Sequence, residues 1–201
     1  PIGFSFGIAH SDPSRPVPVA MLLTRADEDM YRELAVPESC RRFTIIHIGA
    51  GSPSRLWPLA RWVEVTDHLH QAGHQIALTG SRSEAPQIAE LARRVGLPAH
   101  CDCSDTDIQA LAQLVAGARL VVSTDTGVAH LATAFRRPAV TLFGPVPPAW
   151  WGPPPGNPQH RTLWAGKTGD TYGSEADLGL LELTVGDVLC AIDELRRIEL
   201  I

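Results

Sequence analysis

Short apolar runs alternate with amphipathic helical segments along most of this chain, and this alternation limits its fold more than any other feature. Each run is rich in β-branched or aliphatic residues and is read as a buried strand. The predicted strands lie at residues 43–49, 74–80, 119–123 and 138–144, with a weaker one at 97–101. Segments with apolar residues three and four positions apart lie between them and predict helices. These cover residues 57–73, 83–96, 104–118 and 126–135.

The strands do not alternate polar and apolar residues, so both of their faces are expected to be covered. Strands of this kind, separated by helices, predict an α/β fold in which helices pack on both faces of a parallel, Rossmann-like sheet. The region between Pro145 and about Thr184 is expected to be mostly loop, followed by an amphipathic helix over 184–198. We expect the apolar stripe of this helix either to pack on the domain's own sheet or to drive self-association. The stripe consists of Leu189, Ile192, Leu195 and Ile198.

Composition excludes several classes of function. The formal net charge is −5, so we expect no nucleic-acid partner. A secretory signal or membrane-spanning run is not apparent, and we expect a cytoplasmic chain whose four cysteines are reduced thiols. His100, Cys101 and Cys103 lack a second ligand pair at finger-like spacing, so they favour a strand over a metal site. We therefore expect no metal.

Parallel sheets bind ligands at the carboxyl ends of their strands, and the loops predicted there are rich in small and polar residues. Their sequences are GAGSPSR, GSRSE, TDTG and GPVPPAWWGPP. Two phosphate-binding motifs fail in detail. Ser54 stands where a dinucleotide fingerprint needs its third glycine, and AGKT at 165–168 lacks the first glycine of a P-loop.

The TDTG loop leads into a predicted helix whose free N–H groups and partial positive charge suit a phosphate. Thr126 adds a hydroxyl, Gly127 leaves space for the ligand, and His130 shares the helix face. The alternative is that Thr124 or Asp125 only caps the helix, which is a common task for these residue types.

Two charged residues near this edge admit both a functional and a structural interpretation. Arg55 can pair bidentately with a phosphate, or it can be a solvated surface arginine. Glu84 can accept hydrogen bonds from ribose hydroxyls, or it can cap its own helix.

Together these segments resemble glycosyltransferase family 9, the heptosyltransferases of lipopolysaccharide core synthesis. The resemblance rests on GAGSPSRLWP, LTGSRSE and STDTGVAHLATAFRRPAVTLFGPVPPAWWGP, and covers residues 41–155 well. It implies the C-terminal, donor-binding half of a GT-B fold over residues 41–201. Residues 1–40 would then be a linker and the remnant of a preceding N-terminal domain. Because the chain begins with Pro1, we expect a fragment or a processed product that is inactive without that domain.

The resemblance also implies roles for individual residues. Arg55 and Asp125 would support catalysis, with the base on the N-terminal domain. Arg55 replaces the lysine that the family usually has, which keeps the charge and changes its geometry. The full donor-binding set is Ser52, Ser54, Arg55, Gly80, Glu84, Asp125, Thr126, Gly127, His130, Phe143 and Gly144.

The implied reaction is metal-independent, inverting transfer from a nucleoside-diphosphate sugar, with an ADP-heptose-like donor expected, to a cell-envelope glycan. No cofactor is expected. A glycan or glycolipid acceptor would bind through the N-terminal domain, with peripheral association at the inner face of the membrane. Two alternatives stay open: another nucleotide-sugar enzyme of GT-B-like fold, such as an epimerase, and a non-catalytic nucleotide-binding domain.

Overall fold

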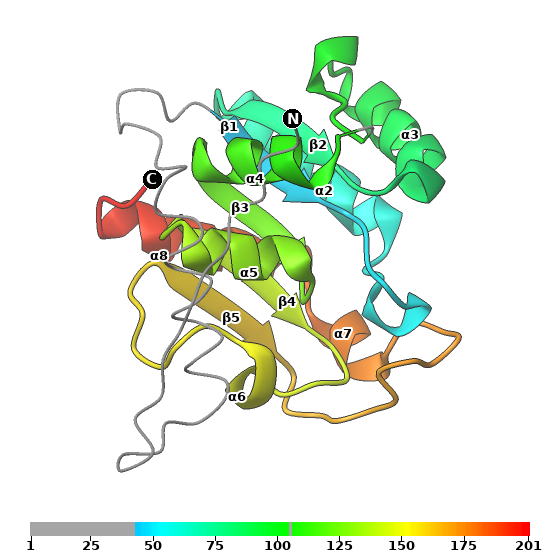
Figure 1. Cartoon of the computed structure of the whole chain (residues 1–201), viewed down its shortest axis with the longest axis vertical. Helices are drawn as coiled ribbons and strands as arrows, with labels where there is room; N and C mark the ends of the chain where they lie inside the picture. The colour runs from blue at the N-terminus through cyan, green and yellow to red at the C-terminus, as the bar shows by residue number, and fades with distance from the viewer. Residues whose placement is uncertain (1–42, 105) are drawn as a thin grey trace, which may run out of the picture.

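A computed structural model describes residues 43–104 and 106–201 (Figure 1). The predicted linker and domain remnant over residues 1–40 lie outside the described residues.

The core of the fold is one five-stranded sheet in which every strand pair is parallel, as the sequence predicts. The strand order is β2-β1-β3-β4-β5. Strand β2 therefore lies on one side of β1, and β3, β4 and β5 follow in order on the other side. The strands are β1 (Phe43–His47), β2 (Gln75–Thr79), β3 (Ala118–Thr124), β4 (Ala139–Phe143) and β5 (His160–Trp164).

Helices cover both faces of the sheet (Figure 1). Successive residues of a strand point to opposite faces, so Ile46 and Ile45 belong to two separate apolar clusters. The cluster around Ile46 is closed by α2 (Leu59–Gln71), α3 (Ala85–Val95), α7 (Leu178–Glu182) and α8 (Val185–Arg197). The cluster around Ile45 is closed by α4 (Ile108–Ala116) and α5 (Gly127–Ala134).

Several helix ends follow from single residues. The carboxylate of Asp107 accepts from the backbone N–H of Ala110 and so begins α4. Gly96 ends α3 in the left-handed conformation, with φ 78°. The remaining short elements are α6 (Pro148–Trp151) and the 3₁₀ turns η3 (Pro53–Arg55), η4 (Arg82–Glu84) and η5 (Ala99–Cys101).

Two strand predictions are wrong. Residues 97–101 form no strand: Ala99–Cys101 is the 3₁₀ turn η5, and pairing with β2 is limited to a bridge between Leu78 and Asp102. The fifth strand is instead β5, inside the region that we expected to be loop. It pairs with β4 along its whole length, from His160 opposite Ala139 to Trp164 opposite Phe143.

The final helix packs on the sheet of its own domain. Ile192 and Leu195 are buried in the core, and Leu189 is partly buried against it. Ile198 lies beyond the end of α8 and is exposed. The predicted apolar stripe is therefore not free as a whole, which removes the reason for expecting it to drive self-association.

Candidate functional site

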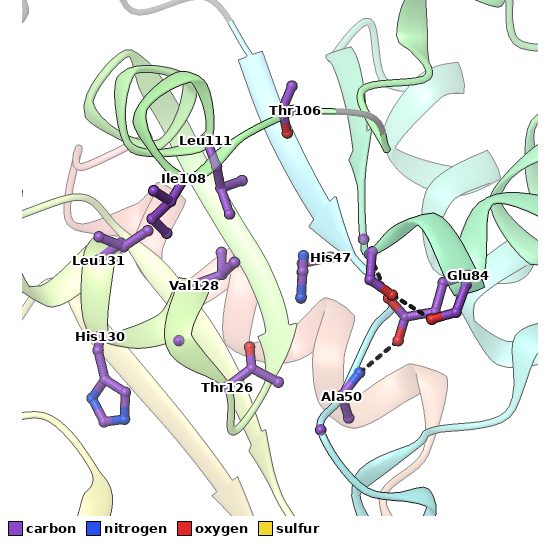
Figure 2. A pocket seen from close by; sticks show the side chains of 15 residues that line it. His47, Ala50, Glu84, Thr106, Ile108, Leu111, Thr126, Val128, His130 and Leu131 are labelled. Atoms are coloured by element: carbon purple, nitrogen blue, oxygen red, sulfur yellow. Dashed lines mark hydrogen bonds between the residues drawn. The ribbon is translucent and has the colours of Figure 1, made fainter. Parts of the chain in front are cut away.

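A cavity of about 770 Å³ opens at the carboxyl ends of β2, β1 and β3 (Figure 2). This is the place where the strand order reverses between β1 and β3, which is where open α/β sheets bind their ligands. Its volume is within the range typical of small-molecule sites. Three segments form its polar walls: the loop after β1 at 50–51, the loop after β2 at 80–84, and the start of α5.

The N-terminus of α5 faces this cavity without a side-chain cap. Thr126 is the N-cap residue, but its hydroxyl donates to the carbonyl of Thr124 at 3.3 Å and not back into the helix. Helices α4, α7 and α8 begin with caps from Asp107, Asp177 and Thr184, whereas α2, α3 and α6 begin, like α5, without a side-chain cap. A Cβ added at exposed Gly127 would meet nothing within 4 Å. The positive end of α5 is therefore open to an anion.

Asp125 immediately precedes this helix start and is buried, with 2% of its surface exposed. Its Oδ2 atom has no hydrogen-bond partner among the described residues. Burial raises the pKa of this carboxyl, while His130 and Arg55 act in the opposite direction. A buried carboxylate oxygen without a partner is costly, so Asp125 lowers the stability of the empty protein.

Arg55 lies beside the same segment. Its Nη1 donates to the backbone carbonyl of Asp125 at 3.1 Å, and its buried Nε has no partner within the described part of the chain. Nη2 approaches the loop after β1, since a Cβ at Gly51 would lie 3.2 Å from it. Arg55 thus brings a cation to the edge of the cavity, between two of its walls.

Glu84 lies on the opposite wall and is held by backbone groups from two loops (Figure 2). Its Oε1 accepts from Ala50 N at 3.0 Å, and its Oε2 accepts from Ser81 N at 2.6 Å and Ser81 Oγ at 2.8 Å. Glu84 therefore caps the start of its own helical segment, which was one of the two predicted alternatives. Lone pairs of the carboxylate are still left for a ligand, because a carboxylate offers about four acceptor positions.

His47 lines the cavity, although no sequence motif predicted it. It ends β1, and its Nδ1 is 2.9 Å from Thr79 Oγ1 at the end of neighbouring β2. Burial lowers the pKa of His47 to about 4, so the ring is neutral at pH 7. The available signal was a polar histidine near the carboxyl end of the strand predicted over 43–49.

The remaining wall of the cavity is apolar and comes from α4 and α5. Ile108 and Leu111 lie on α4, and Val128 and Leu131 on α5 (Figure 2). Ile108 is 67% exposed, although most large apolar residues here are covered. An exposed apolar wall opposite polar loops suits a flat, weakly polar group such as a nucleobase.

The structure brings part of the predicted set together and not the rest. Five predicted residues line the cavity: Gly80, Glu84, Thr126, Gly127 and His130. Asp125 and Arg55 do not line it: Asp125 precedes the lining residue Thr126, and Arg55 Nη2 lies near the lining residue Gly51. Ser52 and Ser54 are buried, and their hydroxyls donate to the carbonyls of Gly173 and Thr171.

Phe143 and Gly144 are also buried and do not line the cavity. A Cβ at Gly144 would lie 3.1 Å from Leu180 Cβ and 3.4 Å from the carbonyl of Ser54, so glycine is needed there for packing. The cysteines form no disulfide among Cys101, Cys103 and Cys190. Within residues 43–104 and 106–201, no group of three or more His, Cys, Asp or Glu could hold a metal ion.

A doubly wound parallel sheet, with an uncapped helix start, acidic and basic side chains and an apolar wall near its switch point, defines a Rossmann-like α/β domain of the class that binds ligands at this edge. A family model described as glycosyltransferase family 9 (heptosyltransferase) matches residues 16–173. The chain belongs to this family.

Curated relatives share moderate identity with about half of the chain. A lipopolysaccharide heptosyltransferase 1 from Salmonella typhimurium is 37% identical over 100 residues, or 48% of this chain and 30% of that protein. One with the same name from Pseudomonas aeruginosa is 35% identical over 97 residues, or 48% of this chain and 27% of its own length. The chain thus spans only part of these relatives.

Solved structures confirm the fold. Escherichia coli ADP-heptose lipopolysaccharide heptosyltransferase II is 22% identical, with a TM-score of 0.65 over 86% of this chain and 52% of that one. The E. coli heptosyltransferase WaaC with ADP-2-deoxy-2-fluoro heptose is 24% identical, also with a TM-score of 0.65, over 90% and 51%. The chain therefore matches about half of a GT-B heptosyltransferase.

A third similar structure bears on metal content. TibC from enterotoxigenic E. coli is described as an iron-containing dodecameric glycosyltransferase; it is 18% identical, with a TM-score of 0.57 over 81% of this chain and 48% of that one. Metal independence of the present chain stays a prediction. Among the described helices, none has the length and apolarity needed to cross a membrane.

Proposed function

We propose that this chain is the donor-binding half of a heptosyltransferase that uses ADP-heptose in lipopolysaccharide synthesis. The observation that carries the proposal is the uncapped start of α5, which opens into the cavity at the switch point of the sheet. Family membership and the printed substrates of similar structures support this choice of donor.

The cavity suggests how ADP would lie. The diphosphate binds the free N–H groups at Thr126 and Gly127, where the helix dipole favours negative charge. Glu84 faces the ribose hydroxyls from the opposite wall, and the apolar wall around Ile108 and Leu111 covers the base. Charge-assisted hydrogen bonds at the diphosphate contribute about 1.5–3 kcal/mol each.

Asp125 and Arg55 would act at the reacting end of the donor. A carboxylate beside a diphosphate is repelled, so the free Oδ2 of Asp125 is better suited to a sugar hydroxyl. Arg55 and the start of α5 stabilise the negative charge that grows on the leaving diphosphate. These two sources of positive charge make the proposed reaction independent of a metal ion, so chelating agents should not change ADP affinity.

Inversion at the anomeric carbon requires an acceptor hydroxyl to attack from the face opposite the departing diphosphate. The proton of that hydroxyl must pass to a general base. We assign this base, and the glycan or glycolipid acceptor, to the N-terminal half of the full protein. This chain would then bind the donor without transferring sugar by itself.

Calorimetric titration with ADP tests the proposal, with UDP as the comparison. Replacing Thr126 and Gly127 together with valine should abolish ADP binding, because the new side chains cover the helix start. The circular dichroism spectrum and the cooperative melting transition should be retained. Unchanged ADP affinity in the double variant, or equal affinity for ADP and UDP in the parent, would overturn the assignment.

A further inference from the structure

The loops after β1 and β2 are joined at the cavity by the side chain of Glu84. The last backbone hydrogen bond between the two strands runs from Ile48 N to Thr79 O, at 3.3 Å. Past this point the loops carry Ala50 and Ser81, which both line the cavity. The two oxygens of Glu84 accept from Ala50 N and Ser81 N, and so connect the loops where the sheet no longer does.

Two glycines leave the space that this carboxylate occupies. A Cβ at Gly49 would lie 2.6 Å from Glu84 Cδ, and the three nearest atoms to it all belong to Glu84. A Cβ at Gly80 would lie 3.0 Å from Glu84 Oε2 and 2.8 Å from Ile88 Cδ1. Neither glycine has a positive φ, so the need for glycine is one of space and not of backbone conformation.

We propose that Glu84 is a positioning residue that fixes the spacing of these two loops, and that Gly49 is glycine to admit its carboxylate. Glu84 would have this role in addition to the ribose contact of the proposed function. The affinity measurements that test the role rest on that proposed function. We call the hydrogen bonds from Ala50 N and Ser81 N to the Glu84 carboxylate the clamp. Without the clamp, these two N–H groups would be solvated by water in the cavity. Loss of Glu84 should therefore weaken ligand binding more than it lowers stability.

The positioning role can be separated from direct ribose contact by changing the ligand. In titration calorimetry, Glu84→Ala should weaken 2′,3′-dideoxy-ADP by about tenfold, and ADP by more, because ADP also loses the ribose contact. A carboxylate that acts only on the ribose hydroxyls would leave dideoxy-ADP affinity unchanged, and this result would overturn the proposal. Glu90→Ala is the matched control, because Glu90 pairs with Arg93 and Arg94 on α3, away from the cavity.

The role of Gly49 is tested by a double-mutant cycle. Gly49→Ala should weaken ADP by about tenfold in the parent chain, because the new methyl group displaces the carboxylate. In the Glu84→Ala chain the same substitution should change the affinity by less than twofold. Equal losses in both backgrounds would show that Gly49 serves another purpose.

Hydrogen exchange gives a readout that needs no nucleotide. The Ala50 and Ser81 amides should exchange faster in Glu84→Ala and in Gly49→Ala than in the parent or in Glu90→Ala. If the parent binds no ADP while these amides respond as expected, the proposed function fails and the clamp stands. If the amides do not respond, the clamp is wrong whatever the affinity data show.

Discussion

Asp125 illustrates, at the scale of single residues, how a binding site is built at the expense of stability. Its carboxylate is almost fully buried, and one of its oxygens has no partner among the described residues. Burial raises its pKa, which means that the folded protein disfavours the charged form. The penalty is absent at low pH, where the folded and unfolded chains are both protonated, and is complete once the pH exceeds the folded pKa.

Asp125→Asn should therefore stabilise the empty protein near pH 7 while weakening donor binding. The expected gain is about 1 kcal/mol in the free energy of unfolding, because asparagine removes the buried charge while its amide is still a buried polar group without a partner. Urea unfolding at pH 7 measures the gain, and calorimetry with ADP-heptose measures the loss. Asp107→Asn is the control, since asparagine also caps helices well. A lower stability of Asp125→Asn would contradict this account.

At the scale of elements, α7 is held on the domain by side chains from the start of α2. Arg61 Nη1 donates to the carbonyls of Leu181 and Leu183, both at 2.7 Å, and Trp57 Nε1 also donates to Leu183 O. The Arg61 guanidinium lies 5.8 Å from the Trp57 ring centroid, a cation–π distance. These contacts satisfy carbonyls at the end of a helix of only five residues.

Arg61→Met should lower the free energy of unfolding by roughly 2–3 kcal/mol, because it removes two charge-assisted hydrogen bonds and keeps the apolar stem. Thermal and urea unfolding measure the loss. Arg93→Met is the comparison: Arg93 is exposed and pairs only on the surface of α3, so little change is expected. Similar losses in the two variants would show that α7 is held by other contacts.

At the scale of elements, sequence patterns predicted four of the five strands and missed the fifth. Strands β1, β2, β3 and β4 were predictable because both of their faces are buried, which leaves continuous apolar runs. Strand β5 is at the edge of the sheet, and its sequence HRTLW is only partly buried. Its pairing depends on β4 and not on its own pattern, so the sequence alone gave no periodic signal for it.

The candidate site was predictable to the extent that backbone geometry dictates it. A polar turn after a buried strand placed Thr126 and Gly127 at the cavity. Ser52 and Ser54 lie only a few positions from Arg55, yet the loop at 171–173 covers them. That contact joins residues more than 110 positions apart in the chain, and local sequence carries no sign of it.

At the scale of the whole molecule, two histidines make the fold sensitive to acid: His160, which is buried, and His47, which is partly buried. Burial lowers the pKa of His47 and of His160 to about 4. The unfolded chain takes up these protons near pH 6.5 and the folded chain does not, so stability falls as the pH drops from 6.5 towards 4. Each histidine contributes roughly 2 kcal/mol of this loss between pH 6.5 and pH 5.

His160→Leu should reduce this acid sensitivity, because an apolar side chain at the start of β5 has no proton to take up. Urea unfolding at pH 6.5 and pH 5 gives the difference in stability, which should be roughly 2 kcal/mol smaller in the variant than in the parent. His70→Leu, at an exposed position on α2, is the control. An unchanged difference in His160→Leu would rule out this source of acid sensitivity.

The open start of α5 has a practical consequence for work on this protein. Because the helix lacks a cap of its own, any small oxyanion that reaches Thr126 and Gly127 supplies the missing acceptor. Phosphate and sulfate in a buffer would therefore occupy the diphosphate position and raise the melting temperature. Nucleotide affinities recorded in such buffers would be underestimates. The measured affinity for the donor would therefore depend on the salt in the buffer.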